Sequence, residues 1–220
     1  MKKGSRVLAA LLAVGLLLGG CAGKSGENSF DDPKGSSIYV TEEGTFSTAT
    51  VENFDSQDPN YELMQLGSED DWKAYLEEMA AEYNGEHGEG AVTLKSCGFG
   101  DGTMKMIFDY ATGSDLVQFT KTYEDTANEV ESLSFTTVED ALSQAAAENA
   151  LFIRLSDGKS ATTDEIAKKS DYHVVVVEGT PGKTQKIKTE GKIAFVSNNV
   201  TINSSYAVET KEGKSYIIFK

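Results

Sequence analysis

The sequence predicts an α+β fold with a mainly antiparallel sheet, a few packed helices and a β-rich C-terminal part. Three observations support this prediction. Residues 68–85 have the spacing of an amphipathic helix. Short alternating stretches bounded by glycine-containing turns lie on both sides of that helix, as expected for paired strands. From His173 to the end the chain is a run of strand patterns, and segregated strands of this kind are typical of α+β domains.

The first strand signals lie in residues 38–40 and 45–51, which are rich in β-branched and aromatic side chains. Glu42-Glu43-Gly44 separates the two segments. Because glycine accepts the positive φ angles that tight turns require, we expect a hairpin with Gly44 in its turn.

A helix follows, and Ser68, a favourable N-cap residue, marks its start. The next three residues are acidic, which suits the positive end of the helix dipole. Gly85 is expected to end the helix. The apolar side chains recur at helical spacing and form one stripe: Trp72, Tyr75, Leu76, Met79 and Tyr83.

Strand and helix patterns alternate through the middle of the chain. Residues 91–97 and 103–110 alternate on either side of a turn that contains Asp101-Gly102, a strong hairpin signal. Thr162 and Glu165 have the spacing of a capping box. The other elements expected here are helices over residues 115–123, 138–148 and 162–169 and a strand over residues 151–155.

His173 precedes four valines, the composition of a buried strand. Thr180-Pro181-Gly182-Lys183 suits a type II turn, with Pro second and Gly third, so we expect a hairpin there. Residues 37–220 can form one domain or two small ones, and a seam, if there is one, is expected near residue 150. Further strands are expected over residues 185–189, 193–196, 200–208 and 216–219.

The N-terminus has the pattern of a signal peptide. Lys2, Lys3 and Arg6 precede 12 residues, 7–18, that carry no polar side chain. This run is shorter than the roughly 20 residues that a membrane-spanning helix needs. The alternative to a lipoprotein signal is an ordinary secretory peptide with an incidental cysteine at position 21.

The segment Leu18-Gly19-Gly20-Cys21 resembles the lipobox of bacterial lipoproteins. The resemblance implies that residues 1–20 are removed and that Cys21 carries a diacylglyceryl group. Two acyl chains suffice for stable anchoring. Residues 21–36 are small and polar and are expected to form a flexible tether.

Without residues 1–20 the chain has 17 basic and 35 acidic residues, a net charge of −18. Arg154 is then the only arginine. Nucleic-acid binding needs clustered Lys or Arg side chains, so this class of partner is excluded. An anionic lipid surface would also repel the folded part. The charge favours cationic or neutral partners.

Gly179-Thr180-Pro181-Gly182-Lys183-Thr184 resembles part of a phosphate-binding loop. The full motif needs a glycine where this chain has Val177, and a helix where residues 185–189 have a strand pattern. We therefore expect a turn at this position and no bound nucleotide.

Two oxygen-rich segments are weak candidates for metal sites. The segment around His87 is favoured as a solvated loop, because one histidine is a poor start for a zinc site; its acidic neighbours are Glu82, Glu86 and Glu89. The second segment departs from the spacing of calcium ligands in an EF-hand loop, so calcium binding there would be adventitious. Its oxygen-bearing residues are Asp55, Asp58, Asn60 and Glu62. No metal or other cofactor is expected.

Hydrolase chemistry needs a base beside a nucleophile, and the chain has two histidines, His87 and His173. The default role of His173, at the edge of the valine strand, is structural, and no nucleophile-elbow motif is present. If Cys21 is lipidated, Cys97 has no partner within the chain and is expected to be a small buried side chain; the alternative is a reactive or intermolecular thiol. No catalytic residue is assigned.

The lipobox and tether are followed by Ser37-Ile38-Tyr39-Val40 and by the segments 88–94, 106–110 and 215–220. Together they resemble a group of uncharacterised lipoproteins from clostridial gut bacteria. The resemblance implies a Gram-positive envelope location and transfers no catalytic residue. The expected function is that of a membrane-anchored extracytoplasmic lipoprotein, a non-enzymatic module that binds an unknown protein or small molecule. The alternative is a small extracytoplasmic hydrolase; the binding component of an importer is disfavoured by the chain length.

Overall fold

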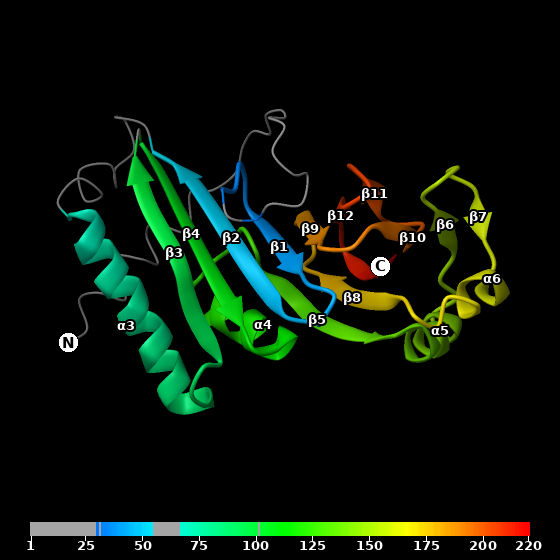
Figure 1. Ribbon diagram of the computed structural model, residues 1–220, viewed down its shortest axis with the longest axis horizontal. Coiled ribbons are helices and arrows are strands. Elements are labelled where there is room, and N and C mark those ends of the chain that lie inside the picture. Colours follow the sequence, from blue (N-terminus) through cyan, green and yellow to red (C-terminus); the bar gives the residue numbers. More distant parts are fainter. Residues whose placement is uncertain (1–29, 31, 55–66, 101) are drawn as a thin grey trace. The chain divides into compact units, whose positions relative to one another are not determined.

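The structure is a computed structural model that describes residues 30, 32–54, 67–100 and 102–220 (Figure 1). These residues form four helices and thirteen strands, and every strand pairing recorded in register is antiparallel. The predicted α+β class is therefore confirmed.

Contacts divide the chain into two units. Unit 1 runs to Ile38 and resumes over Phe46–Glu129. Unit 2 consists of Tyr39–Thr45 and Val130–Lys220. The position near residue 150, where the sequence suggested a seam, falls inside unit 2. Strand β1 (Ser37–Val40) carries the chain from unit 1 into unit 2.

The turn after β1 has the predicted geometry. The Gly44 N–H donates to the Thr41 carbonyl at 3.2 Å, and Gly44 has a φ of +83°. A side chain at this position would also collide with the Phe135 ring, since a Cβ would lie 2.7 Å from Phe135 Cδ1. Glycine is therefore required here by both backbone and packing.

Unit 1 is an antiparallel sheet covered by two helices (Figure 1). Strand β4 (Thr103–Tyr110) lies between β2 (Phe46–Asn53) and β3 (Val92–Gly100). The helices are α3 (Glu69–His87) and α4 (Gly113–Thr122). The register places Thr50 of β2 opposite Met106 of β4.

Helix α3 starts as the sequence predicts. The Asp71 N–H donates to Ser68 Oγ at 3.2 Å, and the Ser68 N–H donates to the Asp71 carboxylate at 2.9 Å, which is a reciprocal capping box. The helix does not end at Gly85 but continues to His87, and Gly88 with a φ of +112° follows it. Gly88 rather than Gly85 takes the conformation that an L-residue disfavours.

The core of unit 1 lies between the two helices and one face of β4. Alternate side chains of β4 share this face. Phe119 of α4 packs on four rings, with centroid separations of 5.0 Å to Phe108, 5.7 Å to Tyr110, 5.4 Å to Tyr83 and 4.6 Å to Tyr123. The buried side chains of α3 are Leu76, Met79, Ala80 and Tyr83, whereas Trp72 and Tyr75 are half-buried.

Unit 2 contains two groups of antiparallel strands and two helices. One group has the order β5-β8-β13-β10-β6-β7, and the other the order β11-β12-β9. Their bounds are β5 Val130–Thr137, β6 Phe152–Arg154, β7 Ser160–Ala161, β8 His173–Gly179, β9 Gln185–Thr189, β10 Ile193–Ser197, β11 Thr201–Ile202, β12 Ala207–Thr210 and β13 Gly213–Phe219. The helices are α5 (Val138–Ala147) and α6 (Thr163–Ala167).

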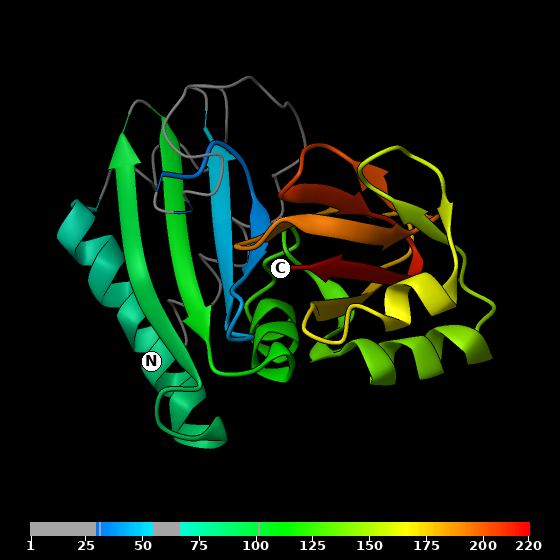
Figure 2. The same ribbon diagram turned by 45° about the vertical axis from the view of Figure 1, so that its right-hand side comes forward.

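The helices α5 and α6 lie together on one face of the six-stranded sheet β5-β8-β13-β10-β6-β7 (Figure 2). All four valines 174–177 are buried, as the composition predicted. Val174 and Val176 belong to the cluster beneath the helices; Val175 and Val177 point to the opposite face, because side chains alternate along a strand. The cluster consists of Val138, Ala141, Ala145, Phe152, Ile166, Val174, Val176, Phe195, Tyr216 and Ile218.

For unit 2, the sequence predicted some strand partners and some strand bounds wrongly. The turn at 180–183 forms, with a hydrogen bond of 3.1 Å from the Lys183 N–H to the Thr180 carbonyl and a φ of +76° at Gly182. It does not join a hairpin, because β8 pairs with β5 and β13 while β9 pairs with β12. The strand expected over 200–208 is two short strands, β11 and β12. Strand β5 was not expected at all.

The capping box predicted for α6 is only half formed. The Glu165 N–H donates to Thr162 Oγ1 at 3.2 Å. The Glu165 carboxylate instead accepts two bonds of 2.7 Å from Arg154, from Nε and Nη2. Arg154 Nη1 also binds Asp157 at 2.8 Å. The planar guanidinium thus links α6 to the β6–β7 hairpin in a fork that suits a carboxylate.

The end of the expected tether is packed against unit 1. Phe30 is 4% exposed and Pro33 is buried. Asp32 pairs with Lys105 at 2.6 Å, and the bonds from Lys105 and then Lys34 lower the pKa of Asp32 to about 2. Among the described residues no helix is both long and apolar enough to cross a bilayer.

Candidate functional site

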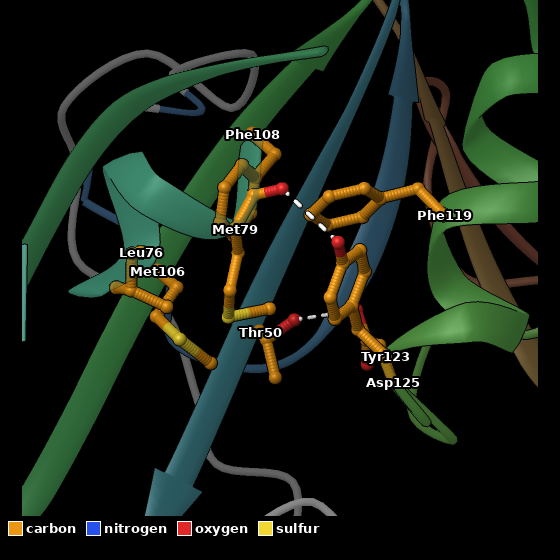
Figure 3. A pocket seen from close by; sticks show the side chains of 8 residues that line it. All are labelled: Thr50, Leu76, Met79, Met106, Phe108, Phe119, Tyr123 and Asp125. Atoms are coloured by element: carbon orange, nitrogen blue, oxygen red, sulfur yellow. Dashed lines mark hydrogen bonds between the residues drawn. The ribbon is translucent and has the colours of Figure 1, made fainter. Parts of the chain in front are cut away.

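Unit 1 contains a small cavity of about 20 Å³ between α3, the sheet and the end of α4 (Figure 3). A space of this size can hold one water molecule. Thr50 and Asp125 supply the polar groups of the lining. The other six residues are apolar or aromatic: Leu76, Met79, Met106, Phe108, Phe119 and Tyr123.

Asp125 reaches the cavity because of the way α4 ends. Tyr123 caps the helix, and Glu124 follows with a φ of +57°. This turn lets the Asp125 N–H donate to the Thr120 carbonyl at 2.8 Å and directs the chain back over the sheet. The Tyr123 hydroxyl donates to the Met79 carbonyl at 3.1 Å, which closes one side of the cavity (Figure 3).

One oxygen of the Asp125 carboxyl is saturated with hydrogen bonds and the other has none. Oδ2 accepts from Thr50 Oγ1 at 2.8 Å and from Asn128 Nδ2 at 2.9 Å. Asn128 Nδ2 also donates to the Ala49 carbonyl at 3.1 Å. Oδ1 of Asp125 and Oδ1 of Asn128 are buried and have no partner among the described residues. Buried polar atoms without partners are unusual in folded proteins.

The electrostatic surroundings of Asp125 disfavour its charged form. Burial raises the pKa of this carboxyl, and the hydrogen bonds from Asn128 and Thr50 only partly oppose the rise. Burial also raises the pKa of Tyr123 to about 12 and that of Tyr110 well above its ordinary value. A carboxyl with a raised pKa beside a cavity marks a candidate functional site.

Sequence reasoning did not select Asp125, one of 35 acidic residues. The available signal was the spacing of Asp125 and Asn128 just after a helix pattern, which suits a turn closed by side chain–backbone bonds. The contact with Thr50 joins residues 75 positions apart.

Other sequence candidates take structural roles or lie elsewhere. Cys21 and the segment Asp55–Glu62 fall outside the described residues. His87 stacks on Tyr83 with a centroid separation of 4.0 Å. Among the described residues, no group of three or more His, Cys, Asp or Glu side chains is placed to hold a metal ion.

His173 stacks on Phe135 at 5.2 Å and contacts Phe219 at 5.8 Å between ring centroids. Cys97 in β3 is half-buried rather than fully buried as expected. Burial raises the pKa of the Cys97 thiol. This disfavours the reactive thiolate form.

No family model, curated protein or solved structure matches the chain. The resemblance to clostridial lipoproteins therefore stays a prediction.

Proposed function

We propose that the protein is an extracytoplasmic lipoprotein, anchored in the cell membrane through a lipid on Cys21, whose folded part binds a partner without catalysing a reaction. The observation that carries the proposal is the short link between the anchor motif and the fold. Phe30, nine positions after Cys21, is already buried in unit 1. Nine residues span at most about 30 Å even when fully extended. Unit 1 would therefore stand close to the membrane.

The roles of the two histidines favour binding over hydrolysis. A hydrolase would need an imidazole placed to take a proton from a nucleophile. Here His87 stacks on Tyr83, and His173 stacks on Phe135. Both rings are used in packing contacts, which supports a structural role for each.

The exposed surface of α3 favours a cationic partner. Seven exposed acidic side chains lie on this helix, with Lys73 as its one lysine: Glu69, Asp70, Asp71, Glu77, Glu78, Glu82 and Glu86. Glu78, Glu82 and Glu86 follow one another at a spacing of four, where like charges destabilise a helix by about 0.2–0.5 kcal/mol per pair. A cationic partner would relieve this repulsion.

The anchor is tested by Cys21→Ser. We expect the variant to leave the membrane fraction and to lose incorporation of labelled lipid, because the thiol that is alkylated has been removed. Membrane retention and lipid labelling equal to the wild type would refute the anchor.

The partner class is tested by titrating the mature protein with oligolysine at low salt. Replacing Glu78, Glu82 and Glu86 together by Gln should weaken binding, whereas the same change at Glu139, Asp164 and Glu212 should not. The control variant loses the same charge from exposed positions in unit 2. Equal weakening by both variants would show that net charge alone attracts the peptide, and the α3 surface would then be rejected as the binding surface.

A further inference from the structure

The sheet of unit 1 carries helices on one face only, as far as the described residues extend. Met106 and Phe108 of β4 line the cavity beside α3 and α4, so they point to the helix-covered face. Lys105 alternates with these residues along β4, and its side chain therefore points to the opposite face. Because β4 lies between β2 and β3, Lys105 cannot reach around an edge of the sheet. We call this second face the helix-free face.

The N-terminal segment is bound on the helix-free face. The carboxylate of Asp32 accepts a hydrogen bond of 2.6 Å from Lys105 Nζ. Four residues later, Ser36 Oγ accepts a hydrogen bond of 3.0 Å from the Val51 N–H of β2. Residues 30 and 32–36, which we call the strap, are thus fastened to β2 at one end and to the central strand β4 near the other.

The strap leads directly to the anchor motif. Phe30 is 4% exposed and Pro33 is buried, so the chain is held against unit 1 at this point. Phe30 is nine positions from Cys21. A chain of nine residues spans about 30 Å when fully extended and about 16 Å as a coil. The outer surface of α3 lies beyond the sheet and beyond a helix about 10–12 Å in diameter. The anchor therefore reaches the helix-free side by the shorter path.

The charges on the two sides of unit 1 favour the same orientation. Strand β4 places one charge of each sign on the helix-free face, Lys105 and Asp109, and the strap adds Asp32 and Lys34. The opposite side carries the seven exposed acidic side chains of α3. An anionic lipid surface repels acidic side chains that lie within a Debye length of it, about 8 Å. Turning α3 away from the bilayer removes this repulsion.

We infer that the helix-free face of unit 1, with the strap bound on it, faces the phospholipid headgroups of the membrane, and that α3 faces away from them. The inference rests on the proposed lipid anchor at Cys21 and adds the surface that the anchor turns toward the bilayer. In this orientation the acidic surface of α3 is exposed to the extracytoplasmic space, where the proposed cationic partner can reach it.

The test uses the lipidated protein on vesicles of phosphatidylcholine and phosphatidylglycerol that contain a nickel-chelating lipid. A nitroxide spin label is attached to Thr93→Cys or Ser96→Cys on the helix-free face, or to Ala74→Cys or Ala81→Cys on α3. All four positions are exposed and uncharged, so the variants are matched. Each also carries Cys97→Ser, so that the label has a single site.

We expect the headgroup nickel to raise the relaxation rate of the label more at Thr93 and Ser96 than at Ala74 and Ala81. Equal or stronger relaxation at the two α3 positions in vesicle-bound protein would overturn the orientation and leave the anchor intact. Absence of the protein from the vesicle fraction would refute the anchor, and the inference with it. Each side is probed at two positions, so the comparison survives if one variant fails to fold.

The strap is tested by adding Phe30→Ala to the labelled variants. We expect the difference in relaxation rate between the two sides of unit 1 to shrink, because the chain is no longer held on the helix-free face. Leu151→Ala, the matched change at an exposed apolar residue of unit 2, should leave the difference as it was. A difference that stays the same in Phe30→Ala would contradict the role of the strap in setting the orientation.

Discussion

Burial gives Asp125 a chemistry that its residue type does not predict. An exposed aspartate is a charged, solvated group near neutral pH. In unit 1 the same side chain is 8% exposed, and its hydrogen bonds come from neutral donors, the side chains of Thr50 and Asn128 and the backbone of Ala127 and Asn128. The distinction between Asp125 and the other acids of the chain thus comes from its environment.

The raised pKa of Asp125 predicts how stability depends on pH. Above the unfolded pKa of about 3.8 the folded state holds a proton that the unfolded state has lost. The free energy of unfolding therefore falls as the pH rises from that value through the folded pKa, and the loss is then complete. An amide at this position does not titrate, so Asp125→Asn should gain stability relative to the wild type between pH 4 and pH 8. Urea unfolding at both values measures this, with Asp164→Asn as the control; a relative loss at pH 8 would contradict the burial argument.

Two glycines around the predicted turn should differ in their tolerance of a side chain. A Cβ at Gly179 would lie 2.1 Å from the Lys211 carbonyl oxygen, whereas Gly182 has open space and a φ of +76°. Gly182→Ala should cost about 1–2 kcal/mol, the penalty of the left-handed conformation. Gly179→Ala should cost more, because a backbone atom has to move. Chemical denaturation compares the two, and an equal or smaller loss at Gly179 would count against the packing described for β8.

At the level of elements, α3 shows why local signals were reliable. Its capping box joins Ser68 and Asp71, three residues apart, and its buried stripe follows from helical periodicity. The end of the helix was missed because Gly85 tolerates a helical conformation, and the decisive feature is the positive φ of Gly88. Glycine content alone does not distinguish the two positions.

Leu76 is fully buried in α3 and tests the core assignment. Leu76→Ala should lower the free energy of unfolding by about 2–5 kcal/mol, from lost apolar transfer and the cavity left behind. Glu77→Ala changes the neighbouring exposed position and should cost little, since alanine is the best helix former. Both are measured by urea unfolding. A Leu76→Ala midpoint equal to that of the control would mean that the stripe is not core.

Strand partners were harder to predict than strand positions. The residues that form β8 and β9 were identified, yet the turn between them joins strands with different partners. The alternation of apolar and polar residues indicates that one face of a strand is buried, but it does not indicate which strand lies beside it. Strand β5 was missed because Ser132, Ser134, Thr136 and other polar residues dilute its apolar pattern.

For the whole molecule, contacts are concentrated within two units, each with its own buried residues. Leu76 in unit 1 and Ile166 in unit 2 are both fully buried helix side chains. We expect Leu76→Ala to increase amide hydrogen exchange mainly in unit 1 and Ile166→Ala mainly in unit 2, because local opening follows contiguous packed regions. A matched increase across both units from either variant would show that they open as one.

The sequence by itself determined the signal-peptide pattern, the acidic character, the helix starts at Ser68 and Thr162, and most strand positions. These features depend on residues next to one another or within one helical turn. Only the tertiary structure decided the pairing of the strands, the placement of Tyr39–Thr45 in unit 2 and the cavity at Asp125. The cavity depends on Thr50 and Asp125, which are 75 positions apart, and on the burial of the Asp125 carboxyl. Desolvation is a property of the packed neighbourhood, so no local pattern of residues encodes it.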